Sequence, residues 1–91
     1  MKEFHLHLVS DATGETLHSV ARACFVQFDG IEPVEHHWPL VRTKGQIEKI
    51  VRNIEEHPGI VLFTIVKEEL RTVLEIGCSR LHVPCISVLD P

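Results

Sequence analysis

A short polar segment directly follows the first apolar stretch of the chain, and its side chains could bind an anion. It covers residues 10–16 (SDATGET), between Leu8-Val9 and a helical pattern. The first backbone N–H groups of a helix carry partial positive charge and bind phosphate or carboxylate. Gly14 would let such an anion approach the backbone closely. A second interpretation stays open, in which Asp11 or Thr13 only caps the helix.

A second polar segment, Arg42-Thr43-Lys44, follows the second apolar stretch. The guanidinium of Arg42 could bind a phosphate group in a bidentate manner. Alternatively, Arg42 is an exposed cation beside a helix cap. Thr43 and Gln46 have the spacing of a capping box, which predicts that a helix begins here.

Apolar residues alternate between strand-like and helix-like spacing along the whole chain. Strands are predicted over Phe4–Val9, Val34–Val41, Ile60–Val66 and Val83–Leu89. Apolar stripes at helical spacing are predicted over Leu17–Phe28, Ile47–Ile54 and Leu70–Leu81. We expect Asp29-Gly30 to end the first helix and His57-Pro58-Gly59 to end the second.

This βαβαβαβ order predicts one α/β domain over residues 1–91, a three-layer fold with a four-stranded parallel sheet and helices on both faces. Pro39 cannot donate to a sheet ladder, which places the second strand at an edge. The predicted strand order is therefore 2-1-3-4. Ligands of such sheets bind where the order reverses, here beyond strands one and three, next to residues 10–16. Gly77 lies on the apolar stripe of the third helix, which predicts close packing on the sheet.

Composition describes an ordinary globular protein and excludes several classes of function. The chain has 91 residues, 44% hydrophobic and 24% charged, with a net charge of −4. The charge argues against nucleic-acid or acidic-membrane binding. We expect no membrane span, and no signal peptide precedes the first strand, so a cytoplasmic location is predicted. Three cysteines without a C-x-x-C pair predict neither a disulfide framework nor a zinc knuckle.

Seven histidines are present, but no carboxylate or cysteine recurs with them at ligand spacing, so no metal site is predicted. His5 and His7 should share one strand face, and the neighbouring His36 and His37 should point to opposite faces. A phosphoacceptor receiver domain is excluded because the third strand ends Thr64-Ile65-Val66-Lys67, without the required aspartate. Trp38 is predicted to lie in the core or to contact a partner. The terminal fourth strand would be a free sheet edge, which favours a chain that continues beyond it.

Four segments resemble one family in order and spacing. They are HLVSDATGETLHSVARA, VEHHWPLVRTKGQIEKIV, HPGIVLFTIVKEELRTVLE and LHVPCISVLDP. Together they resemble the amino-terminal part of the pyruvate, phosphate dikinase regulatory proteins, whose relatives regulate phosphoenolpyruvate synthase. The S-D-x-T-G-E-T and W-P-L-V-R-T segments are the most distinctive.

The resemblance implies a bifunctional serine/threonine kinase and pyrophosphorylase. Such enzymes phosphorylate a threonine of the dikinase with ADP as donor, and remove that phosphate with inorganic phosphate, releasing pyrophosphate. Their P-loop-like nucleotide-binding segment lies in a carboxyl-terminal domain, which the 91 residues lack. The chain alone is therefore expected to be inactive and to hold no tightly bound cofactor, because phosphoryl transfer depends on positioning by the phosphate cradle.

The resemblance also selects candidate site residues. Asp11 is the catalytic candidate, and the candidates for phosphate binding are Ser10, Thr13, Gly14, Glu15, Arg42 and Thr43. The expected protein substrate is pyruvate, phosphate dikinase or phosphoenolpyruvate synthase. The alternative is a stand-alone flavodoxin-like binding module, in which residues 10–16 cap a helix and Trp38 marks a partner surface.

Overall fold

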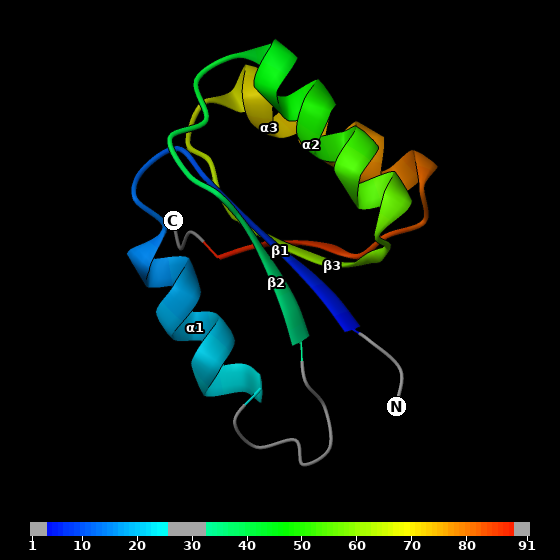
Figure 1. The fold of residues 1–91 in the computed structure, drawn as a ribbon. Coiled ribbons are helices and arrows are strands. Elements are labelled where there is room, and N and C mark those ends of the chain that lie inside the picture. The colour runs from blue at the N-terminus through cyan, green and yellow to red at the C-terminus, as the bar shows by residue number, and fades with distance from the viewer. Residues whose placement is uncertain (1–3, 26–32, 89–91) are drawn as a thin grey trace.

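The computed structural model describes residues 4–25 and 33–88 of the chain. Within them the elements are β1 (Phe4–Ser10), α1 (Glu15–Phe25), β2 (Pro33–Trp38), α2 (Lys44–Glu56), β3 (Gly59–Thr64), α3 (Glu68–Arg80) and β4 (Cys85–Ser87). The strands form one parallel sheet in the order β2-β1-β3-β4. Helix α1 covers one face, and α2 and α3 cover the other (Figure 1). The predicted three-layer α/β fold with strand order 2-1-3-4 is confirmed.

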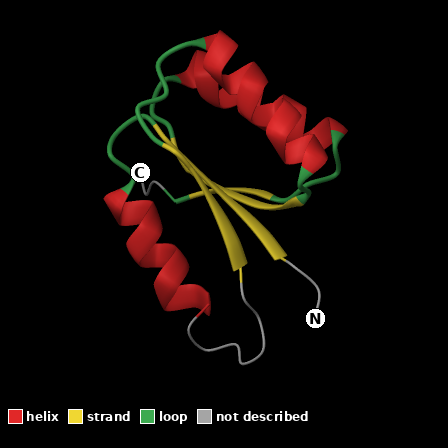
Figure 2. Cartoon of the chain, in the orientation of Figure 1, coloured by secondary structure: helices red, strands yellow, loops and turns green. Residues whose placement is uncertain are grey.

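Strand β2 lies at the sheet edge, as Pro39 predicts, but it is shorter than the sequence pattern suggested. It ends at Trp38, because Pro39 has no N–H to donate and Leu40 adopts a positive φ of 57°. Figure 2 shows the chain leaving this strand as a loop toward α2. The predicted continuation of the first helix to Phe28, its end at Asp29-Gly30, and Leu89 lie outside the described residues.

The two faces of the sheet bury cores of different size. The larger core, between the sheet and helices α2 and α3, contains the fully buried Phe63, Ile54 and Leu74. The smaller core, under α1, contains Leu6, Leu8, Leu17, Ala21 and Leu62. Alternation along β1 produces both, because successive side chains of a strand point to opposite faces.

Gly77 does not mark a close approach of helix and sheet, and that prediction is wrong. A Cβ atom at Gly77 would lie 2.8 Å from Cγ2 of Val51, a side chain of α2. The missing side chain therefore allows α3 to approach α2. The helical stripe alone could not distinguish a neighbouring helix from the sheet.

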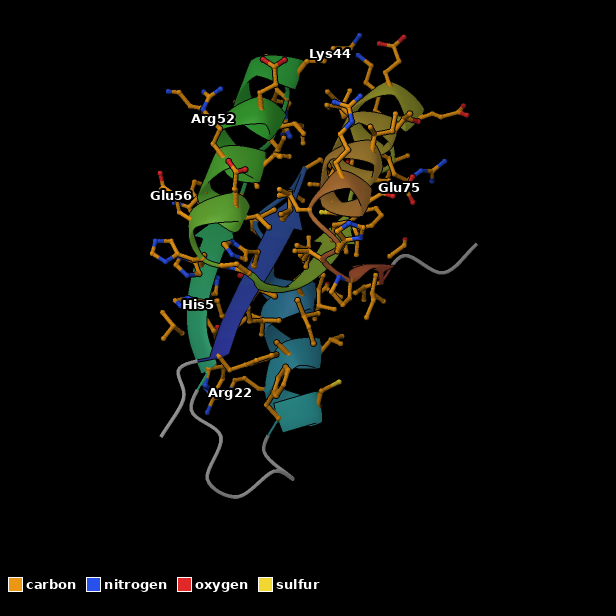
Figure 3. All side chains as sticks on the ribbon, turned by 90° about the vertical axis from the view of Figure 1, so that its right-hand side faces the viewer. His5, Arg22, Lys44, Arg52, Glu56 and Glu75 are labelled. Carbon is orange, nitrogen blue, oxygen red and sulfur yellow. The ribbon has the colours of Figure 1, made fainter. Side chains whose placement is uncertain are left out.

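Charged side chains of the helices point away from the sheet. Figure 3 shows this for Lys44, Arg52 and Glu56 on α2 and for Glu75 on α3.

Among the described residues, none of the helices has the length and apolar character needed to cross a membrane.

Candidate functional site

The loops that follow β1 and β2 lie together at the carboxyl edge of the sheet and are joined by backbone hydrogen bonds. The N–H of Leu40 donates to the carbonyl of Ala12 over 2.9 Å, and that of Val41 donates to the carbonyl of Ser10 over 3.0 Å. The loop after β3 joins them through Asp11 N–H, which donates to the Thr64 carbonyl over 3.2 Å. Three segments that are far apart in sequence therefore form one surface where the strand order reverses.

Ser10 supports this surface from below. It is 2% exposed, and its hydroxyl oxygen accepts hydrogen bonds from Ala12 N–H and from the Thr64 hydroxyl, each over 3.0 Å. A buried hydroxyl with two donors fixes the turn that leaves β1. Thr64, which sequence reasoning did not select, is therefore part of the site.

Asp11 joins the β1 loop to its two neighbouring loops. Its carboxylate oxygen Oδ2 accepts a hydrogen bond from Val66 N–H over 2.9 Å, and its carbonyl accepts one from Nη1 of Arg42. The carboxylate thus binds the loop after β3 and not the first turn of α1. Of the interpretations left open by the sequence, capping of α1 by Asp11 does not match these contacts.

Gly14 immediately precedes α1, at a position where the backbone conformation favours glycine. Gly14 has a φ of +85°, a left-handed conformation that other residues adopt at a cost, and its carbonyl accepts the hydrogen bond from His18 N–H over 3.0 Å. The N–H groups of the next residues form the first turn of α1, which begins at Glu15. This is the arrangement in which a helix binds an anion.

A cavity of about 440 Å³ lies in front of this helix start. It is lined by Ser10, Asp11, Ala12, Thr13, Gly14, Glu15, Thr16, Thr64 and Val88. The structure therefore brings five of the candidates together: Ser10, Asp11, Thr13, Gly14 and Glu15. The carboxylate of Glu15 interacts favourably with the positive end of the helix dipole. The same negative charge would repel a bound anion unless a cationic side chain also contacts that anion.

Two cationic side chains, Arg42 and Lys67, line a neighbouring hollow of about 500 Å³. The other residues that line it are Asp11, Val41, Val66 and Leu70. Asp11 lies between the two spaces, since it lines both. Arg42 is exposed, and its Nη1 also donates to the carbonyl of Val41 over 3.3 Å. Lys67, at the start of α3, is a second cation that sequence reasoning did not select. The sequence could have identified Lys67 by its position, because Lys67 follows the third strand just as Arg42 follows the second.

Thr43 lines neither space, because it caps α2. Its hydroxyl accepts a hydrogen bond from Gln46 N–H over 3.2 Å, and Oε1 of Gln46 accepts one from Thr43 N–H over 3.0 Å. This is the predicted capping box, which is confirmed. Oε1 of Gln46 also accepts from Arg42 N–H over 2.6 Å, so the box fixes the backbone that carries the guanidinium.

The two histidines with a shifted pKa, His7 and His36, belong to a separate four-histidine cluster, which also contains His5 and His57. The His7 side chain is fully buried, accepts from Nε1 of Trp38 over 3.4 Å and donates through Nε2 to the His57 carbonyl over 2.9 Å. The rings of His7 and His36 are stacked, with centroids 4.5 Å apart. Burial, followed by repulsion from the other histidines, lowers the pKa of His36, and burial is also the main cause of the lowered pKa of His7.

The carboxyl-edge surface lies within the part of the chain that matches a known protein family. Residues 6–91 match the family model described as kinase/pyrophosphorylase. The chain belongs to the kinase/pyrophosphorylase family. Similar relatives include proteins named pyruvate, phosphate dikinase regulatory protein from Paramagnetospirillum magneticum (59% identical over 91 residues), Rhizorhabdus wittichii (47%) and Rhodospirillum rubrum (45%). The resemblance drawn from the four segments is therefore confirmed at the level of the family.

The match covers all of this chain but only 29% of the first of these relatives and 33% of the other two. The chain thus spans about a third of the length of the relatives that it matches.

Proposed function

We propose that this chain forms a phosphate-binding wall in the active site of a longer kinase and pyrophosphorylase that regulates pyruvate, phosphate dikinase. The observation that carries the proposal is the position of Asp11. It lies between the cavity at the start of α1 and the hollow that contains Arg42 and Lys67. A carboxylate between a helix N-terminus and two cations suits a reaction in which a phosphoryl group moves between oxygens.

In the kinase reaction, the β-phosphoryl group of ADP would be transferred to a threonine hydroxyl of the dikinase, which loses its proton, and AMP would leave. In the dephosphorylation reaction, an oxygen of inorganic phosphate would attack the phosphorus of the phosphothreonine, so that pyrophosphate forms and the threonine hydroxyl is regenerated. Arg42 and the helix start at Gly14 would hold phosphate oxygens, and Asp11 would orient the attacking oxygen. Ser10, Thr13 and Glu15 would shape the cavity, and Thr43 would hold the Arg42 backbone in place.

The nucleotide itself would be held by a further, carboxyl-terminal domain with a P-loop-like segment. Two apolar side chains at the carboxyl-edge surface are open to solvent, Val66 at 70% exposure and Leu40 at 54%. Exposed apolar groups beside a polar site are typical of surfaces that another domain covers. The relatives' greater length supports the same proposal, in which the 91 residues alone do not turn over. We also propose that the full-length enzyme acts in the cytoplasm.

The test is kinase activity of the full-length enzyme with the dikinase as substrate. We expect Asp11→Ala and Arg42→Ala each to lower the rate by about 100-fold or more, because each would remove a group that positions or stabilises the transferred phosphoryl. Lys44→Ala is the matched control, since Lys44 is an exposed cation beside Arg42 that lines neither space. Wild-type rates for both site variants, with folding verified by circular dichroism, would contradict the proposed roles.

A binding measurement separates this proposal from a stand-alone interaction module. Amide NMR of the 91-residue chain should show shifts at Gly14 and Glu15 when phosphate, pyrophosphate or ADP is added. Gly45, near the other loop, should shift if Arg42 takes part. The module hypothesis has less support, because Trp38 packs against the core and donates to His7, which accounts for it structurally.

A further inference from the structure

A second group of chemically active side chains lies on the opposite face of the sheet edge from the four-histidine cluster. It consists of His18 on α1 and of Glu35 and His37 on β2, and we call it the His18–Glu35–His37 group. Each residue offers one ligand atom, and these three atoms lie within 4.8 Å of one another. In Figure 1, α1 lies on one face of the sheet and β2 is the edge strand beside β1.

Two distances in the group match the spacing between ligands of one metal ion. Nδ1 of His18 lies 3.4 Å from Oε1 of Glu35, and Nε2 of His37 lies 3.0 Å from the same oxygen. Zinc bonds to histidine and carboxylate are about 2.0–2.2 Å long, so two ligands of a tetrahedral ion lie about 3.4 Å apart. The Glu35 oxygen thus already has ligand spacing to both imidazoles, which lie within 4.8 Å of each other and would close around one ion.

Two of the ligand atoms are buried without a hydrogen bond. Nδ1 of His18 and Oε1 of Glu35 are hidden from solvent, and neither has a hydrogen-bond partner of acceptable geometry. Buried polar atoms in native proteins nearly always have a partner, and an ion is one of the partners that explain an exception. An ordinary ion pair on the surface would leave these atoms in water.

The surroundings leave room for a further ligand. A hollow of about 450 Å³ opens at the group and is lined by Thr13, Gly14, Glu15, His18, Ser19 and His37. Glu15 lies one helical turn before His18, on the same side of α1. Its carboxylate or a water molecule could complete the coordination.

We propose that the His18–Glu35–His37 group binds a divalent transition metal, with Zn²⁺ as the best match to two imidazoles and one carboxylate. The fourth position faces the hollow beside Gly14. The sequence predicted no metal site because its ligands are separated by 17 residues along the chain, and only the packing of α1 against β2 joins them. The four-histidine cluster is a poorer site, since both ring nitrogens of His7 are already engaged and no carboxylate is among its members.

The experiment is calorimetric titration of the 91-residue chain with Zn²⁺, on a Cys24→Ser background that removes the exposed thiol. We expect one Zn²⁺ per chain. His18→Ala, Glu35→Gln and His37→Ala should each weaken binding by at least about 10-fold. Two controls keep full affinity: His82→Asn removes an exposed histidine elsewhere, and His57→Ala removes a ring of the four-histidine cluster.

Absence of Zn²⁺ binding by the parent protein, or equal affinity in the three ligand variants, would overturn the proposal. Loss of binding in His57→Ala with retention in His37→Ala would move the site to the four-histidine cluster and also overturn it. Thermal unfolding with and without Zn²⁺ gives a second readout, because a bound ion raises the melting temperature of the parent and not of the ligand variants. The titration contains no phosphate or nucleotide, so its outcome is independent of the proposed phosphotransferase role.

Discussion

The two faces of the sheet differ in how much they bury and in what they leave open. Among the described residues, twelve buried side chains form the core under α2 and α3, and five form the core under α1. Helix α2 has a complete capping box, whereas α1 starts at a glycine in front of a cavity. The face with the larger core therefore buries more apolar side chains, and the thinner face leaves a cavity open at the start of its helix.

Two neighbouring residues of β2 show the same difference. His36 points to the α2 side, where it stacks on His7 at a centroid distance of 4.5 Å, and burial lowers its pKa. His37 points to the α1 side, where it is exposed and lies 3.0 Å from a carboxylate oxygen of Glu35. Residues of one type thus acquire a packing role on one face and a ligand-like environment on the other, because Glu35 and the hollow beside Gly14 lie on the second face.

The largest effect is expected for a substitution of Gly59, the first residue of β3, which pairs with His5 of the four-histidine cluster. A Cβ atom there would lie 1.8 Å from the carbonyl oxygen of His5, a backbone atom that cannot move without breaking the pairing of β1 with β3. Gly59→Ala should therefore abolish cooperative folding, measured by urea unfolding and circular dichroism. Gly45→Ala is the control: it is exposed in α2, and its Cβ would meet only the Thr43 hydroxyl at 3.9 Å, so stability should be kept or slightly raised. Cooperative unfolding of Gly59→Ala, like that expected for Gly45→Ala, would contradict the prediction.

Native-state hydrogen exchange measures the difference between the faces directly. We expect amides of α1 to exchange through openings that cost about 2 kcal/mol less than those of α2, because α1 packs on a small core and, within residues 4–25 and 33–88, no second helix shares its face. Equal protection of Leu17 on α1 and Ile50 on α2 would show that the two faces open together.

A smaller effect separates the two loops of the carboxyl edge. Thr43→Ala removes the capping side chain of α2 and should lower the free energy of unfolding by about 1 kcal/mol. Thr13→Ala, at an exposed position in the loop before α1, should change it by less than about 0.5 kcal/mol. Denaturant titrations of both variants test this, and a larger loss for Thr13→Ala would reverse the roles assigned to the loops.

The smallest effect is a pH dependence from the four-histidine cluster. The pKa values of His7 and His36 are lowered in the folded protein, so the unfolded chain binds protons at a higher pH than the folded one. The free energy of unfolding should therefore fall as the pH drops from neutral through the ordinary histidine pKa of about 6.5. His36→Phe keeps the stacking ring and should reduce this acid sensitivity, measured by urea unfolding at about pH 7.5 and about pH 5.5. His82→Asn, far from the cluster in sequence and exposed, should leave it unchanged. An unaltered pH profile in His36→Phe would exclude that histidine as a source.

Much of this protein follows from local patterns in its sequence. Alternation of strand-like and helix-like periods gave the element order, Pro39 placed β2 at the edge, and together they predicted the strand order. The capping box at Thr43 was predicted because it depends on residues three positions apart, and four ordered segments identified the family. The polar segment 10–16 was located correctly at the junction of strand and helix, because the change of period marks such a junction. The loop itself is shorter, since Ser10 ends β1 and α1 begins at Glu15.

The tertiary structure decided what local patterns do not encode. It assigned Asp11 to Val66 and Arg42 and not to α1, added Thr64 and Lys67 to the site, and turned Gly77 toward α2. It also brought His18 to Glu35 and His37. Each of these contacts joins segments far apart in the chain, and their partners are fixed by the strand order and by which helix covers which face. A one-dimensional pattern reports the period of an element, whereas the neighbour that its side chains meet is determined only when the layers pack.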